Sequence, residues 1–549
     1  MIKRRVFYTS MAFLLAMTTA CGNVTATTTV NSFVESETST ETPLASTTGT
    51  VTNLSVSTEN VTASATGEYK DSDEYVDYTT KECTYIGLNE DSANITGKKA
   101  GKVTVENGVI TITEKGYYVL EGTFKGSIVI DAPEDEKVHL VLNGVTITTE
   151  DGSAIYEKNS DKLIVMLVSG TVNTLTDGSN YSDTSDEAAD ACLYATNDLT
   201  INGEGTLNVT GNYKAGIKTK DDLKIMSGTL NISAEDDAVK GHDSLTIAGG
   251  FITVMAGDDG LHSDGDVIVD NGTINVLKSV EAVEGLTITV NGGTINTIST
   301  DDGFNATSGN SSGFGGGFGG GFPGGDFKGD GNFNGGERPE MPQSGERPEM
   351  PDLSNMPTPP DGAEMPDLSN STAAGNVDST SDPESSETTD SVTPTITING
   401  GVIYVNSGGD GLDANGNIEM NGGYVYVSGT NNDGNNATDY DGTCLMNGGN
   451  LIATGSSGMY QSISAGSGCY AIDYTESTVS EGTECVLKDG DTVLYTFTVA
   501  KNANAILITG DKLENGKEYT LVLGSESKTV TASEGSGRGG FGGNFGGKR

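Results

Sequence analysis

Short runs of alternating apolar and polar residues recur along the middle of the chain. A small residue followed by an aliphatic residue or Phe marks each repeat, in steps of 22, 22, 22 and 21 residues: Gly216-Ile217, Ala238-Val239, Gly260-Leu261, Ala282-Val283 and Gly303-Phe304, with Gly411-Leu412 after an interruption. Each repeat also holds two alternating runs with a glycine turn between them, such as Leu223-Lys224-Ile225 and Leu230-Asn231-Ile232. Strands of period two that return at a fixed spacing indicate a solenoid, in which each coil stacks on the next. We therefore expect an all-β fold, a right-handed parallel β-helix.

The repeat predicts how the chain is divided. The solenoid is expected in two parts, residues 67–307 and 394–478. Residues 479–532 leave the repeat and contain two runs typical of ordinary strands, Thr492 to Val499 and Tyr519 to Val522. These strands would form a small C-terminal β cap over the open end of the solenoid, which otherwise exposes unpaired backbone groups.

Residues 308–393 interrupt the repeat with a different composition. They contain Gly-Phe-Gly repeats and a doubled Gly-Glu-Arg-Pro-Glu-Met-Pro segment. Asp302 and Asp410 hold the same repeat position 108 residues apart, and removing 86 residues restores the step of 22. The segment is therefore predicted to be a disordered insertion at a turn, and we favour a spacer over a contact for cell wall or partner proteins. The Gly-rich tail, residues 533–549, has a similar composition.

The N-terminus has the features of a bacterial lipoprotein signal. Lys3, Arg4 and Arg5 precede a mostly apolar stretch that is too short for an ordinary transmembrane helix. The sequence Thr-Thr-Ala-Cys-Gly around Cys21 resembles a lipobox, with Thr18 where Leu is usual. Residues 1–21 are predicted to be a signal peptide with lipidation at Cys21, and residues 22–66 a Ser/Thr-rich tether. An ordinary cleaved signal is the alternative. The expected location is extracellular, as a cell-surface lipoprotein.

The charge balance narrows the possible partners. The 549 residues include 30 Lys and Arg against 77 Asp and Glu, a formal net charge of −47. Such acidity argues against nucleic acid as a partner, because binding phosphates requires a basic surface. It suits a secreted protein that holds divalent cations. The chain has no Trp, so stacking against sugar rings would rely on Tyr.

Acidic residues precede the small-aliphatic pair in several repeats, and stacking would bring them into one column: Asp236, Asp237, Asp258, Asp259, Glu281, Asp301, Asp302 and Asp410. Adjacent coils lie about 4.8 Å apart, and two like charges at ~5 Å repel by roughly 3 kcal/mol at an effective dielectric of about 20. Calcium, whose carboxylate ligands lie at about 2.3–2.6 Å, would bridge carboxylates of adjacent coils. We predict calcium ions held by the aspartates of this column. The alternative is that they are turn formers whose side chains bond nearby backbone amides.

A second column follows the aliphatic residue and is expected to point outward. It begins with Lys218, Lys240 and His262, cations beside the predicted calcium that would suit an acidic sugar such as galacturonate. Pairing of these lysines with neighbouring aspartates is the alternative. Tyr404 and Tyr426 occupy the outward middle position of aligned strands. They would form either a sugar-stacking pair or, as we favour, an aromatic ladder between strands.

Together these residues resemble a known family. The run Gly116-Tyr117-Tyr118-Val119-Leu120, then Ala154-Ile155-Tyr156 and the Asp-Asp/Gly-Leu and Asn-Gly-Gly repeats, resemble the carbohydrate-binding β-helix lipoproteins of cellulolytic clostridia. The resemblance implies a pectate-lyase-like right-handed β-helix with bound calcium, in which the Asp-Asp positions are ligands. It also implies binding of cellulose or of acidic sugars such as polygalacturonate, without demonstrated cleavage.

The sequence thus predicts a calcium-binding, non-catalytic cell-surface protein, a monomer that binds plant cell-wall polysaccharide and touches the membrane only through its lipid. A pectate lyase is the first alternative. Such enzymes need a base to remove a proton from the sugar, and every Arg lies outside the repeat, so Lys218 or Lys240 would have to serve. An adhesin or wall stalk without sugar specificity is the second alternative.

Overall fold

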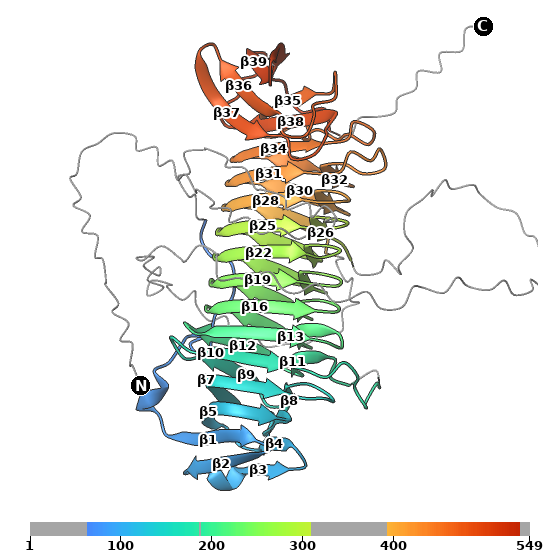
Figure 1. The fold of residues 1–549 in the computed structure, drawn as a ribbon. Coiled ribbons are helices and arrows are strands. Elements are labelled where there is room, and N and C mark those ends of the chain that lie inside the picture. Colours follow the sequence, from blue (N-terminus) through green and yellow to red (C-terminus); the bar gives the residue numbers. More distant parts are fainter. Residues whose placement is uncertain (1–62, 186–187, 309–391, 538–549) are drawn as a thin grey trace, which may run out of the picture. The chain divides into compact units, whose positions relative to one another are not determined.

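Each repeat forms three short strands, because its apolar residues alternate with polar ones and each strand pairs with its equivalent in the next coil. The computed structural model describes residues 63–185, 188–308 and 392–537. One coil consists of β14 (Ala215–Thr219), β15 (Asp222–Ile225) and β16 (Thr229–Ala234). The pairings between coils are parallel, so the predicted parallel β-helix is confirmed (Figure 1).

The strands stack into three parallel ladders. Ladder I contains β9 (Lys162–Leu167), β12 (Asp198–Gly203), β15, β18 (Ser244–Ile247), β21 (Asp266–Val269), β24 (Thr287–Val290), β27 (Thr395–Ile398), β30 (Asn417–Met420) and β33 (Cys444–Met446). Ladder II contains β10 (Val172–Thr176), β13 (Thr206–Gly211), β16, β19 (Phe251–Met255), β22 (Thr273–Lys278), β25 (Thr294–Ile298), β28 (Val402–Asn406), β31 (Tyr424–Ser428) and β34 (Asn450–Gly455).

Between residues 154 and 414, ladder III is built from the small-aliphatic pairs, which the sequence did not identify as strands. It contains β4 (Val109–Ile112), β6 (Ser127–Asp131), β8 (Ile155–Asn159), β11 (Ala191–Ala195), β14, β17 (Val239–Gly241), β20 (Leu261–Ser263), β23 (Val283–Gly285), β26 (Phe304–Ala306), β29 (Leu412–Ala414) and β32 (Thr438–Tyr440). Several of these strands have a single large apolar residue, as in Val239-Lys240-Gly241, so they show no alternation.

The first coils are less regular, as the sequence indicated. The long strands β5 (Gly116–Lys125) and β7 (Lys137–Thr148) pair with each other, and β7 continues into both ladder I and ladder II. The remaining N-terminal elements are the 3₁₀ turns η1 (Tyr78–Thr80) and η2 (Ala100–Lys102) and the strands β1 (Cys83–Glu90), β2 (Ser92–Gly97) and β3 (Val103–Glu106). None of the helices among the described residues is long and apolar enough to cross a membrane.

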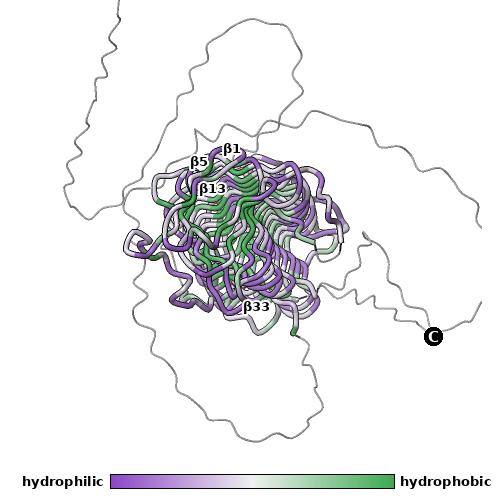
Figure 2. Tube along the Cα trace, turned by 90° about the horizontal axis from the view of Figure 1, so that it is seen from below, coloured by the Kyte–Doolittle hydropathy of each residue, from purple (hydrophilic) through white to green (hydrophobic). Residues whose placement is uncertain are grey.

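The inward residues of the three ladders form one continuous core. Figure 2 shows apolar residues gathered inside the coils and hydrophilic residues at their rim. Leu223, Leu230 and Val239, one from each ladder, are completely buried. The glycine turn between ladders I and II explains the Asn-Gly-Gly pattern. Gly293 has φ of 83°, a conformation that side chains rarely adopt, and a Cβ there would lie 2.6 Å from the carbonyl oxygen of Gly272.

The solenoid resumes in register after the interruption. Thr395 pairs with Thr287 in ladder I, and Leu412 pairs with Phe304 in ladder III. The equivalence of Asp302 and Asp410 is therefore confirmed. The predicted disorder concerns residues 309–391, which lie outside the described residues, and the same is true of the predicted signal peptide and of Cys21.

The tether predicted over residues 22–66 extends too far. Residues 63–77, which we call the strap, run across the outer face of ladder I and contact successive coils. The Ala63 amide donates to the Asn291 carbonyl oxygen at 3.0 Å, and the Thr66 amide donates to Asp270 at 3.0 Å. Asp73 at the other end accepts from Thr200 at 2.8 Å and lies 2.5 Å from the ammonium of Lys162. At least residues 63–66 therefore belong to the folded body.

A separate antiparallel unit covers the last coil, so the predicted cap is confirmed. The strands β35 (Tyr470–Tyr474) and β38 (Ala505–Gly510) continue ladder II beyond β34 in antiparallel fashion. A four-stranded antiparallel sheet follows, in the order β37 (Thr492–Thr498), β36 (Glu484–Asp489), β39 (Glu518–Leu523) and β40 (Glu526–Thr531). The cap thus begins by Tyr470, earlier than residue 479.

Candidate functional site

The predicted acidic residues share one position, the turn that leads from ladder II to ladder III. Each turn bonds to the next coil: the Ala238 amide donates to the Asp259 carbonyl oxygen at 2.8 Å, and the Gly303 amide donates to that of Asp410 at 2.9 Å. These bonds set Asp237, Asp259, Glu281, Asp302 and Asp410 in one column. The column therefore exists as predicted. Asp258 and Asp301 are exposed beside it, and Asp236 is partly exposed.

The aspartates of the column also serve the backbone. Asp237 Oδ1 accepts from the Asp259 amide at 3.2 Å, and Asp302 Oδ1 accepts from the Asp410 amide at 2.6 Å. Asp410 Oδ1 accepts from the Asn436 amide in the same way. The turn-forming interpretation thus accounts for one oxygen of each of these three side chains. Their second oxygens are not used by these bonds, and they determine what else the column can hold.

The predicted second column lies in register on the outer face of ladder III. Lys218, Lys240, His262, Glu284, Asn305 and Asp413 are neighbours in successive strands. Because each residue from Lys240 onward follows an acidic-column position by three residues, the two columns run side by side. The charge of this outer column changes along the solenoid, from cations at Lys218, Lys240 and His262 to carboxylates at Glu284 and Asp413.

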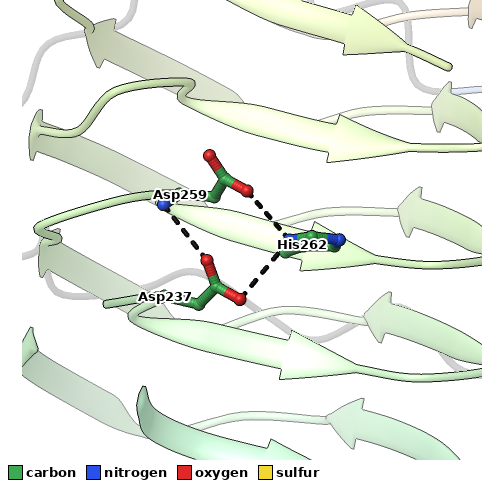
Figure 3. A group of neighbouring side chains, drawn as sticks. All are labelled: Asp237, Asp259 and His262. Carbon is green, nitrogen blue, oxygen red and sulfur yellow. Dashed lines mark hydrogen bonds and ion pairs between the residues drawn. The ribbon is translucent and has the colours of Figure 1, made fainter. Parts of the chain in front are cut away.

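In the cationic half, the protein itself neutralises the aspartates. His262 Nδ1 lies 2.8 Å from Asp259 Oδ2 and 3.4 Å from Asp237 Oδ2, and Figure 3 shows the ring between these carboxylates of successive coils. Burial lowers the pKa of His262, but hydrogen bonds with Asp237, Asp259 and Asp264 outweigh it and raise the pKa to about 11. The imidazole is therefore charged at neutral pH.

The two lysines of this half are also paired with aspartates. Lys218 Nζ lies 2.8 Å from Asp190, and Lys240 Nζ lies 3.5 Å from Asp237 and 3.3 Å from Asp264. Burial lowers the pKa of Lys240, but the adjacent carboxylates raise it more, so that the pKa lies above its usual value. These contacts match the alternative of aspartate pairing. A role of Lys218, Lys240 and His262 toward a sugar remains a prediction.

In the acidic half, carboxylates face one another. Ligand oxygens of Asp302, Asp410 and Asp413 lie within 4.8 Å of one another. Burial, followed by repulsion between carboxylates, raises the pKa of Asp302 and of Asp413 to about 8; for Asp410, burial and nearby carboxylates raise the pKa to about 7. Asp259, Glu281 and Glu284 form a similar group, in which the pKa of Glu281 rises to about 8 and that of Glu284 to about 7, again mainly through burial.

The donors of the acidic half fit a hard cation such as calcium. All are oxygens, the ligand type that calcium prefers. Asn305 lies between Glu284 and Asp413 in the outer column. Its buried Oδ1 has no hydrogen-bond partner among the described residues, although its Nδ2 donates to Glu281 at 2.9 Å. A Cβ at Gly409 would clash with the Oδ1 atoms of Asp301 and Asp302, so glycine keeps this space open. The sequence did not assign Glu284 or Asp413 as ligands; their spacing of three residues from the acidic column was the available signal.

The cap contacts one member of the predicted tyrosine pair. Tyr404 and Tyr426 are partners in β28 and β31, as expected. However, the Tyr426 ring packs against Phe497 of the cap with centroids 6.4 Å apart, and its hydroxyl donates to the Thr498 carbonyl oxygen at 2.7 Å. The cap therefore contacts both the ring and the hydroxyl of Tyr426, and its role in sugar stacking stays a prediction. Tyr404 stays half-buried.

Comparisons with known proteins relate the chain to a carbohydrate-binding family. A family model described as "Carbohydrate-binding domain-containing protein" matches residues 106–434. A curated protein of the same description from Acetivibrio thermocellus is 32% identical over 147 residues, which are 26% of this chain and 51% of the relative. The chain thus spans about half the length of this relative.

A solved structure of a "polysaccharide lyase-like protein from C. thermocellum" in a gadolinium derivative is 31% identical, covers 39% of this chain and 91% of its own, and has a TM-score of 0.37. The family match, by contrast, extends over more than half of the chain and over both columns. The chain therefore belongs to the carbohydrate-binding domain-containing protein family.

Proposed function

We propose that the protein is a calcium-binding, non-catalytic polysaccharide-binding protein of the cell surface. Its family supports polysaccharide binding. The observation that carries the calcium proposal is the group Asp302, Asp410 and Asp413, whose carboxylates are perturbed mainly by burial and by other carboxylates. Asp302, Asp410, Asp413 and the Asn305 amide oxygen would hold the ion. A divalent cation there would replace the protons that otherwise neutralise the group.

The proposed ligand class is an acidic polysaccharide such as polygalacturonate. Calcium on the outer face of ladder III would supply positive charge where the sugar carboxylate approaches. Exposed Asp301 lies beside the half-buried ligands. The cationic half continues the same face, and the exposed Asp264 shared by Lys240 and His262 is the group that a sugar carboxylate would have to displace. The binding partner would be plant cell-wall polysaccharide.

The lysine environments favour binding over cleavage. A lyase base must be unprotonated to take a proton from the sugar. Lys240 has a raised pKa, because the neighbouring carboxylates outweigh the effect of burial, and Lys218 is paired with Asp190 at 2.8 Å. The lyase alternative predicts unsaturated product from polygalacturonate and calcium, which absorbs ultraviolet light. Release of that product, and its loss in Lys240→Met, would replace our proposal with an enzyme.

Calcium titration and affinity electrophoresis test the proposal. We expect the protein to bind calcium by calorimetry and to be retarded by polygalacturonate with calcium but not with a chelator. The double variant Asp302→Asn/Asp413→Asn should lose both properties while keeping its circular dichroism spectrum. Asp91→Asn, an exposed carboxylate between β1 and β2, is the matched control. Equal retardation by polygalacturonate, xylan and cellulose, insensitive to the chelator, would support the adhesin or stalk alternative.

The surface location is part of the proposal. The sequence around Cys21 supports a lipid anchor. Growth with an alkyne-labelled fatty acid should label the wild-type protein at the membrane, and Cys21→Ser should be unlabelled. Label retained in Cys21→Ser would contradict lipidation at this residue.

A further inference from the structure

The group Asp237, Asp259 and His262 differs from the acidic half of the column because it contains a nitrogen donor. One donor atom from each residue lies within 4.8 Å of the other two (Figure 3). The aspartates belong to successive turns, and the histidine belongs to β20. Calcium prefers oxygen ligands, whereas imidazole is a common ligand of zinc and other transition metals. The group therefore has the donors for a metal of a different class from calcium.

The spacing of the three donor atoms fits a small ion. His262 Nδ1 lies 2.8 Å from Asp259 Oδ2 and 3.4 Å from Asp237 Oδ2. Ligand atoms at about 2.0–2.1 Å from a tetrahedral zinc ion lie about 3.3 Å apart, so only small movements are needed. The Asp237 carboxylate is held in place, because its Oδ1 accepts from the Asp259 amide at 3.2 Å. The aspartate side chains are only 9% and 6% exposed.

The other nitrogen of the imidazole ring faces a further carboxylate. His262 Nε2 lies 3.2 Å from Asp264 Oδ1. Histidines that bind metals usually donate their second ring N–H to such a group, which fixes the tautomer and the ring orientation. With the proton on Nε2, the lone pair of Nδ1 is available on the side of the aspartates. Nδ1 is buried, and its ion-pair contacts with them lack good hydrogen-bond geometry in the described part of the chain.

The charges around the group balance when a divalent ion is added. Asp237, Asp259 and Asp264 carry three negative charges. Lys240 Nζ, 3.5 Å from Asp237 and 3.3 Å from Asp264, carries one positive charge. A protonated His262 leaves this set with a net charge of −1. A divalent ion on a neutral imidazole makes the net charge zero, because two positive charges replace that of the proton.

We propose that Asp237, Asp259 and His262 bind a transition-metal ion such as zinc, at a site distinct from the calcium group around Asp302. Three protein ligands leave a further position for water or for a ligand from solution, as in open zinc sites. Asp264 would be a positioning residue, which holds the imidazole ring without binding the ion. The proposal assigns two aspartates that the sequence predicted as calcium ligands to another metal. It depends neither on calcium binding nor on polysaccharide binding.

Calorimetric titration of the full chain with zinc chloride tests the site. Excess calcium is present, so that the all-oxygen groups are filled. We expect one bound zinc ion in the wild type, bound roughly a hundredfold more weakly in His262→Gln and roughly tenfold more weakly in Asp264→Asn. His242→Gln is the matched control and should bind like the wild type, because this histidine is 56% exposed and contacts Asp243 at 2.6 Å. Circular dichroism spectra check that each variant is folded.

Cobalt(II) gives a second measurement. Its visible absorption should show protein-bound metal in the wild type and should be lost in His262→Gln. If that variant does not fold, Asp264→Asn still tests the site, because the Asp264 side chain is 47% exposed.

Three results would each overturn the proposal: no zinc binding in excess calcium, equal zinc binding by the wild type and both site variants, or loss of binding in His242→Gln alone. If zinc binds as expected while the protein binds neither calcium nor polygalacturonate, the proposed function falls and the zinc site stands.

Discussion

Replacing Lys162 by Met should strongly destabilise the protein, because Lys162 neutralises a carboxylate that is buried beneath the strap. Lys162 Nζ lies 2.5 Å from Asp73 Oδ1, and the two side chains are 1% and 0% exposed. Burial raises the pKa of Asp73, but the hydrogen bond from Lys162 and further donors lower it below the usual value. Asp73 is therefore ionised in the fold and depends on its partners.

The expected loss in the free energy of unfolding depends on the partners that Asp73 keeps when the Lys162 ammonium is removed. Removing one partner of a buried ion pair costs about 3–5 kcal/mol. Asp73 would keep the Thr200 hydroxyl at 2.8 Å, the Lys70 amide at 2.9 Å and the more distant Lys224 ammonium at 3.8 Å. These contacts place our expectation at the lower end, about 3 kcal/mol.

Urea unfolding followed by circular dichroism measures this loss. Lys98→Met is the control, because Lys98 is 71% exposed in its pair with Glu82; it should change stability by less than about 1 kcal/mol. The double variant Asp73→Asn/Lys162→Met should recover part of the loss, because it removes the buried carboxylate together with its main partner. The recovery is partial because the buried Lys224 ammonium then loses Asp73. A Lys162→Met protein as stable as the control variant would refute the reasoning.

Three further predictions concern the columns and the core. Without calcium, stability should fall as pH rises from about 4 through 7–8, because the raised pKa values of Asp302, Asp410 and Asp413 let the folded state hold protons that the unfolded state has lost. Calcium should remove this fall. Melting curves at pH 5 and 8 measure it, and a flat calcium-free profile would count against the acidic group. His262→Gln should lower the free energy of unfolding by about 2 kcal/mol, because Asp237 and Asp259 lose their imidazolium partner. His242→Gln, at the exposed pair with Asp243, should lower it little. The contribution of His262 to stability is present below pH 6.5 and is lost as pH rises through about 11. Gly303→Ala should cost about 1–3 kcal/mol in urea unfolding, because its Cβ would clash with Val405 and the Gly411 carbonyl oxygen, whereas Gly101→Ala meets nothing nearby; equal costs would contradict the close packing of the coils.

The sequence was sufficient for the features that repeat at a fixed step. The pairing of Asp302 with Asp410 and of Tyr404 with Tyr426 follows directly from counting residues, because each coil stacks on the next. Most of ladder III was missed as a set of strands, since a strand such as Val239–Gly241 has only one apolar residue and shows no alternation.

The features that were missed depend on contacts between distant residues. The Thr66 amide bonds to Asp270, 204 residues away, and no local pattern announces such a contact. The cap covers Tyr426 through Phe497 and Thr498, which lie outside the repeat. The neutralising role of His262 was missed for a different reason: an outward position was taken to mean a free side chain, although its ring turns back to the aspartates of two coils.

The strap also changes how the solenoid should come apart. In a repeat protein each unit touches only its neighbours, so the ends can fray one coil at a time. Here backbone and side-chain groups of the strap bond to successive coils, from the β9 coil to the β24 coil. The strap therefore joins these coils, and they should unfold as one cooperative block. The windings from β27 to β33 lie beyond its bonds and depend on the cap instead, so hydrogen exchange should reveal two blocks of protection with a boundary between β24 and β27.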